Sequence, residues 1–221
     1  VDDIIKQKIY AAFGTETGLL SGVSYEEFTN ETDYIQGSSV VGASIASDIK
    51  KGAILAIIFA VLGIGLYILL RFRNLPYSVS TIVALAFDAL FIIGIYALLW
   101  GLVPFSLEID QTFIGAILTA VGYSVNDKVV IFDRVREYNK LFPKGDRYEI
   151  YNSALNSTLD RTFNTSLSTL LVLIIIFFFA GETIRSFAFA MILGVVSGTI
   201  SSLFIAVPMA FDMFGKKKAK K

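Results

Sequence analysis

The feature of this sequence that most constrains its fold is a series of long apolar segments. Gly52–Leu70 contains no charged residue. At about 1.5 Å per residue, a helix of this length crosses a hydrocarbon core of about 30 Å. Four more segments have comparable length and hydrophobicity: Ser78–Trp100, Thr112–Phe132, Arg161–Ala180 and Phe187–Phe211. The sequence therefore predicts an all-α membrane protein built on a bundle of five transmembrane helices.

We assign residues 50–214 to this bundle and residues 215–221 to a basic tail. The helices are expected at about 52–71, 78–101, 112–136, 161–181 and 186–212. Residues 1–49 are polar, with helical spacing over Asp2–Phe13 and weak strand-like alternation over Ser21–Val41. Because so short a segment cannot bury a sufficient core, we interpret residues 1–49 as the tail of an extracytoplasmic α+β domain whose beginning is missing.

The basic residues of the short connections predict the orientation. With five spans, one side of the membrane receives Arg71 and Arg73, the basic residues of 133–160 and the lysines of 216–221. Cytoplasmic loops carry an excess of Lys and Arg, so we expect the N-terminal segment outside and the C-terminus inside. Lys50 and Lys51 violate this rule modestly.

The composition excludes several kinds of chemistry. The chain has no histidine and no cysteine, which removes thiolate metal sites, zinc proteases and nucleophiles activated by histidine. We therefore expect neither an enzyme nor a metal or other cofactor. The 19 basic and 19 acidic residues balance, and no nucleic-acid partner is expected.

Asp127 is the first candidate functional residue, because charges inside spans are rare and often mark ion pathways. It follows Asn126 in the third predicted helix and should lie in the inner half of the bilayer. Alternatively, Lys128 neutralises it, or both side chains snorkel to the interface. However, adjacent helical residues point about 100° apart, so Lys128 does not share the face of Asp127.

Arg161 and Asp88 are the other charged candidates. Arg161 begins a polar stripe with helical spacing on the fourth span, in which Thr165 lies one turn further on. That stripe could also be a packing face of small polar residues. Asp88 lies in the second span, where it is either functional or a lone acid bonded to a neighbouring helix.

A carboxylate facing an arginine across two helices is a workable proton device. A small change in their separation alters how readily the carboxylate binds a proton. We therefore expect Asp127 and Arg161 to face each other, in direct or water-bridged contact. The proposed proton pathway comprises Asp127, Arg161, Asn126, Thr165 and Asp88.

Several motifs resemble the SecF family, the second half of the SecDF protein-export accessory. They are Gly122-Tyr123-Ser124-Val125-Asn126-Asp127, Asp133-Arg134-Val135-Arg136-Glu137, and Arg161-Thr162 followed by Thr165-Ser166 and Ser168-Thr169-Leu170-Leu171. The resemblance extends from about Val41 to Phe211. Ala43 and Asp160 depart from it, at positions where proline and serine are expected, and Asp160 could divert the pairing of Arg161.

The resemblance implies a relative of the resistance-nodulation-division transporters. It implies a proton-coupled accessory of the Sec translocon channel that assists the export of unfolded polypeptides across the bacterial inner membrane. It also implies a SecD-like half as partner, separate or fused, and a place for Asp127 and Arg161 on the proton route. The alternatives are the membrane half of a small-molecule efflux transporter of that superfamily, and an intramembrane enzyme or a structural subunit.

Overall fold

The computed structural model describes residues 2–13, 24–30 and 43–218, and all regular structure in those ranges is helical. The chain divides into two compact units near residue 46. In chain order the elements are α1 (Asp2–Phe13), α2 (Tyr25–Asn30), α3 (Ala43–Phe72), α4 (Leu75–Leu99), α5 (Gln111–Leu141), α6 (Arg147–Phe179), α7 (Glu182–Ser201), the π-helical segment η1 (Ser202–Ala206) and α8 (Val207–Lys218).

The first unit contains α1 and α2. The helix expected over Asp2–Phe13 is present. The strand-like alternation expected over Ser21–Val41 is wrong for Tyr25–Asn30, which is helical, and the rest of that segment lies outside the described residues, apart from Ser24. Tyr25 and Phe28, three positions apart, share a helical face, and both rings lie near Tyr10, at 5.4 and 5.6 Å between ring centroids. This shared aromatic contact explains why a helix forms where alternation predicts a strand.

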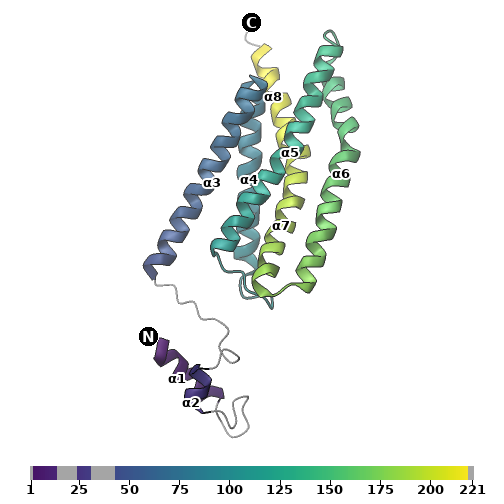
Figure 1. The fold of residues 1–221 in the computed structure, drawn as a ribbon. Helices are drawn as coiled ribbons and strands as arrows, with labels where there is room; N and C mark the ends of the chain where they lie inside the picture. The colour runs from purple at the N-terminus through teal and green to yellow at the C-terminus, as the bar shows by residue number, and fades with distance from the viewer. Residues whose placement is uncertain (1, 14–23, 31–42, 219–221) are drawn as a thin grey trace. The chain divides into compact units, whose positions relative to one another are not determined.

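The second unit is a bundle of helices that cross it in alternating directions (Figure 1). Five of its stretches are long and apolar enough to span a membrane: Ile49–Phe72, Leu75–Leu99, Gln111–Leu141, Arg147–Phe179 and Ile184–Phe214. The expected fold of five transmembrane helices is therefore confirmed. The end of α3, the turn between α5 and α6 and the end of α8 lie at the same end of the bundle (Figure 1).

The helices α5 and α6 extend beyond the lengths that hydropathy suggests. The fourth span, expected to begin at Arg161, lies in a helix that begins at Arg147. Only 142–146 separate it from α5. Asp146 caps α6 by accepting a hydrogen bond from the backbone N–H of Glu149, a pairing typical of helix starts. The polar connection expected over Asp133–Asp160 is thus mostly two helix ends.

The fifth span is interrupted by η1, which lies between α7 and α8. Pro208 follows this segment and has no backbone N–H, so it cannot continue the regular α-helical hydrogen-bond ladder. A π-helical turn is a rare local widening that often occurs at functional sites. Ser201, the last residue of α7, therefore lies directly before the widened turn.

Small residues let α5 and α7 pack closely. A Cβ atom added at Gly194 would lie 2.3 Å from the Ala120 Cβ, and one added at Gly198 would lie 2.8 Å from the Ser124 Cβ. Gly194 and Gly198 thus form a small-residue face, and it explains how two spans approach without bulky side chains between them.

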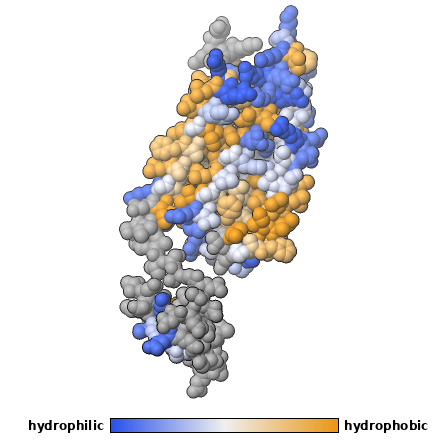
Figure 2. All heavy atoms as spheres, in the orientation of Figure 1, coloured by the Kyte–Doolittle hydropathy of each residue, from blue (hydrophilic) through white to orange (hydrophobic). Residues whose placement is uncertain are grey.

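The surface of the bundle carries two kinds of side chain. Large apolar side chains face outward on several spans, and Phe179 is 87% exposed. In the visible face, hydrophilic side chains gather at the end that holds the α5–α6 turn, and a paler band separates the apolar regions (Figure 2). An apolar exterior of this kind suits a lipid environment.

Candidate functional site

The charged residues of the spans fall into two neighbouring groups. Asp88 on α4 and Lys128 on α5 lie in the interior of the bundle and form an ion pair. Asp127, the preceding residue on α5, is buried as well. Arg161 lies on the exposed side of α6. Lys128 thus belongs to the interior group with Asp88, whereas Asp127 and Arg161 form the second group.

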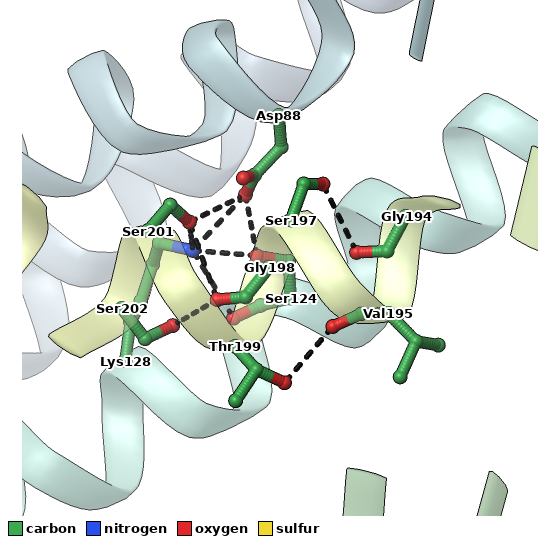
Figure 3. A network of polar contacts seen from close by, with 10 residues as sticks. All are labelled: Asp88, Ser124, Lys128, Gly194, Val195, Ser197, Gly198, Thr199, Ser201 and Ser202. Carbon is green, nitrogen blue, oxygen red and sulfur yellow. Dashed lines mark hydrogen bonds and ion pairs between the residues drawn. The ribbon is translucent and has the colours of Figure 1, made fainter. Parts of the chain in front are cut away.

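The interior group is centred on one carboxylate oxygen of Asp88 (Figure 3). Asp88 Oδ2 accepts hydrogen bonds from Ser124 Oγ at 2.6 Å, from Ser201 Oγ at 2.9 Å and from Lys128 Nζ at 3.2 Å. Lys128 Nζ also donates to Ser201 Oγ at 3.0 Å and to Ser124 Oγ. Charge-assisted bonds of this kind are stronger than neutral ones. Side chains from α4, α5 and α7 are therefore joined in one network.

The neighbouring hydroxyl groups of the fifth span mostly bond to their own helix. Ser202 Oγ donates to the Gly198 carbonyl at 2.6 Å, and Thr199 Oγ1 donates to the Val195 carbonyl at 2.9 Å. Such local bonds satisfy hydroxyl groups inside a membrane helix. They leave Ser201 as the hydroxyl group of α7 that reaches Asp88 (Figure 3).

Asp127 is buried without a direct partner for one of its oxygens. Its residue exposure is 5%, and Oδ2 has no hydrogen-bond partner among the described residues. The positive charges of Lys128 and Arg161 both act on this carboxyl group. Within the described part of the chain no ion pair joins Asp127 to Arg161, so the direct contact is not formed, and a water-bridged contact stays a prediction.

An open surface cavity of about 450 Å³ lies between α5 and α6. Asn126 and Thr165, both expected in the pathway, line it together with Tyr123, Asn164, Ser168 and Thr169. Tyr123 Oη donates to the Thr165 carbonyl at 3.0 Å and lies 3.0 Å from Thr169 Oγ1. The polar stripe of α6 therefore serves both for packing against α5 and as the wall of a cavity.

A second cavity, of about 650 Å³, has Arg161 in its wall and lies toward the α5–α6 turn. Its two carboxylates are already paired, Asp133 with Arg71 at 3.2 Å and Glu137 with Arg134 at 2.7 Å. Arg161 itself forms no ion pair within the described ranges, and Asp160 does not divert it. Because Arg161 and Thr165 lie one turn apart on α6, the two cavities follow one another along the α5–α6 seam.

The structure thus brings four of the predicted residues together and gives the fifth a different setting. Asn126, Asp127, Arg161 and Thr165 lie along the seam between α5 and α6. Asp88 lies in the interior network. Asp88 is bonded to its neighbouring helices, but it is not a lone acid, because the positive charge of Lys128 balances its negative charge.

The sequence interpretation missed Lys128 as part of the site. Its side chain is 0% exposed, so the alternative that it snorkels to the interface is wrong. Two features of the sequence pointed to a role for Lys128. Ser124 lies one turn before Lys128 on the same helical face, and the second span carries a single acid, Asp88. Among the described residues no cluster of Asp and Glu could hold a metal ion.

Comparisons with known proteins give consistent results. The profile of the family described as "Protein export membrane protein SecD/SecF, C-terminal" matches residues 23–216. A relative named "Protein translocase subunit SecF" from Rhodothermus marinus is 45% identical over 196 residues, which are 89% of this chain and 63% of that relative. The protein of the same name from Escherichia coli O157:H7 is 33% identical over 192 residues, 87% of this chain and 57% of its own length.

A solved structure is similar as well. The crystal structure of SecDF in its super-membrane-facing form matches 83% of this chain and 23% of that chain, with a TM-score of 0.69 and 35% sequence identity. The chain spans only 63% and 57% of the two relatives named above.

Proposed function

Because this chain belongs to the SecD/SecF family of protein export membrane proteins, we propose that it is part of a proton-coupled accessory subunit of the Sec translocon. In this role the protein uses the proton gradient across the bacterial inner membrane to assist the export of unfolded polypeptides. The support is the family match over most of the chain and the buried carboxyl group of Asp127 in the α5–α6 seam. Its partners are the translocon channel and a SecD-like half, separate or fused.

The observation that carries the proton coupling is the setting of Asp127. A buried carboxyl group whose Oδ2 has no partner among the described residues keeps an oxygen free to bind a proton or to accept from a bridging water. The positive charges of Lys128 and, to a smaller extent, Arg161 act on it electrostatically. Since a charge in the membrane is costly unless compensated, binding or release of a proton at Asp127 changes how favourably the two helices sit together.

The two cavities of the α5–α6 seam are the proposed route toward this carboxyl group, although Asp127 lines neither of them. Asn126 and Thr165 provide an amide and a hydroxyl group in the wall of one cavity, and Arg161 lies in the wall of the other. Polar, roomy sites of this kind hold ordered water. We assign proton binding to Asp127, charge compensation to Arg161, and water positioning to Asn126 and Thr165.

The SecD-like half is proposed to cover this same face. Asn126, Asn164, Thr165 and Ser168 are exposed along the seam. Amide side chains at membrane depth are unfavourable against lipid and normally face protein or water. A second helical bundle over the seam would remove them from lipid and enclose the cavities.

The proposed orientation follows the basic residues. The α5–α6 turn and the end of α8 lie at the same end of the bundle, and the sequence there is rich in Lys and Arg. Cytoplasmic segments have this composition. We therefore propose that the C-terminus lies in the cytoplasm and the N-terminal segment outside.

The test is gradient-dependent export in inverted membrane vesicles that contain the full-length protein. Asp127→Asn removes the titratable proton at nearly constant volume, so the gradient-dependent part of export should disappear while the protein still accumulates. Arg161→Lys keeps the charge but loses the planar guanidinium, so a partial defect is expected. Asp160→Asn is the matched control, since Asp160 is exposed and beside Arg161 in sequence. Wild-type export by Asp127→Asn would refute the proposal.

A further inference from the structure

The ion pair between Asp88 and Lys128 is more enclosed than any other charged contact in the described part of the chain. The side chains are 2% and 0% exposed. The other two ion pairs, Arg71–Asp133 and Arg134–Glu137, are at least 38% exposed on each side. The interior pair therefore has a setting that the surface pairs do not share.

Stability alone does not explain such a pair. A buried ion pair can often be replaced by apolar residues of similar size without loss of stability, because removing two charges from water is costly. The best-attested benefit of buried polar groups is that they fix one arrangement of helices over others. This pair joins α4 to α5, so the arrangement that it can fix is that of these two helices.

The contacts of Asp88 define the rotation of α5. Both Ser124 and Lys128 of α5 donate to its Oδ2 atom, and the two residues lie on one face of the helix. Ser201 of α7 donates to the same oxygen. The close approach of Gly198 to Ser124 holds this face against α7. The face of α5 that carries Lys128 is thus held from two sides.

Fixing Lys128 also fixes the direction of Asp127. Consecutive residues of an α-helix point about 100° apart. With Lys128 held toward α4 and α7, Asp127 is directed to a different face, where the charge of Arg161 on α6 acts on it. A modest rotation of α5 would move Asp127 relative to Arg161.

We propose that Asp88 and Lys128 are positioning residues, which hold α5 at the rotation that presents the carboxyl group of Asp127 to the α5–α6 seam. This inference rests on the proposed function of Asp127. Asp88 then has a role other than carrying the proton, and Lys128 positions α5 besides balancing the charge of Asp88.

The experiment compares two double variants of the full-length protein. Asp88→Leu with Lys128→Met removes both charges at similar shape, so that no buried charge is left alone. Asp88→Lys with Lys128→Asp exchanges the charges and keeps the tether. Ser197→Ala is the control, since Ser197 is a buried serine of the same helix, α7, whose hydroxyl group donates to the Gly194 carbonyl of its own helix. Folding is checked by size-exclusion chromatography in detergent.

Rotation is read from single introduced cysteines, since the chain has none of its own. In protein purified in detergent without the SecD-like half, Asn126→Cys reports an exposed position and Val121→Cys a buried one. The ratio of thiol labelling at 126 to labelling at 121 should fall several-fold in the apolar pair. It should stay near the wild-type value in the exchanged pair and in Ser197→Ala.

Export provides the second measurement. A misplacement of about 1 Å can reduce a rate about 100-fold, so gradient-dependent export should drop by about tenfold or more in the apolar pair and recover in the exchanged pair. A folded apolar pair with unchanged labelling and export would overturn the inference. If the apolar pair does not fold, the exchanged pair decides, and a folded exchanged pair with a lowered labelling ratio would overturn the inference. Asp127→Asn distinguishes failure of the proposed function from failure of this inference. If Asp127→Asn exports normally, the proposed function fails, but the labelling ratio still tests the rotation of α5, because labelling does not depend on export.

Discussion

Replacing Gly194 with alanine tests the packing of α5 against α7 most directly. The added Cβ would lie 2.3 Å from the Ala120 Cβ, whereas carbon atoms in contact prefer about 3.5–4.0 Å. The Ala120 Cβ is fixed to its backbone and cannot turn away. Because these two distances differ by about 1–2 Å, the two helices must separate by about that amount.

The expected loss of stability follows from this overpacking. Extra methyl groups forced into a well-packed core typically cost about 1–3 kcal/mol. Alanine recovers up to about 1 kcal/mol of helix propensity relative to glycine. We expect a net loss of about 1–2 kcal/mol for Gly194→Ala, which for a chain of this size lowers Tm by about 2–8 °C at about 2–4 °C per kcal/mol.

Thermal unfolding of the full-length protein in detergent, followed by size-exclusion chromatography after heating, measures this effect. Gly63→Ala is the matched control, because a Cβ at Gly63 meets nothing within 4 Å and should leave Tm unchanged or higher. Combining Gly194→Ala with Ala120→Gly removes the clash and should recover most of the loss. If Gly194→Ala were as stable as Gly63→Ala, or if Ala120→Gly gave no recovery, the close approach of α5 and α7 would be wrong.

Two further predictions concern topology and a buried hydrogen bond. Single cysteines at Ser106 and Lys144 should react with an impermeant thiol reagent from opposite sides of the membrane, with Ser106 outside; labelling of Lys144→Cys from outside in intact cells would reverse the scheme. Tyr96→Phe removes the hydroxyl group that donates to the Ser186 carbonyl at 2.6 Å and leaves that carbonyl without this donor, so it should cost about 1–3 kcal/mol, and an unchanged Tm in detergent would contradict it.

The spans themselves were predictable from the sequence because hydrophobicity is a local property. Each segment accumulates enough apolar residues to be recognised without knowledge of its neighbours. The small residues Gly194 and Gly198 were recognisable for the same reason, since their spacing of four places them on one helical face. Asp127 and Arg161 stood out because charges are rare in such segments.

The ends of the helices were less predictable. The charged residues after Phe132 and before Arg161 lower the hydropathy, yet they continue α5 to Leu141 and start α6 at Arg147. A hydropathy pattern reports where a helix leaves the apolar region and not where its hydrogen-bond ladder stops. Capping by Asp146 decides where α6 begins, and a hydropathy pattern does not report capping.

What the sequence alone determined is therefore which residues are confined to the membrane, because that depends on the transfer of each segment from water. Only the tertiary structure decided which of them meet. Lys128 lies next to Asp127 in the chain, but its partners are Asp88 and Ser201, which are 40 and 73 positions away. The rotation of α5, supported by the close packing of Gly198 against Ser124, brings Lys128 to these partners. No local pattern records that rotation, because it results from the packing of all the spans together.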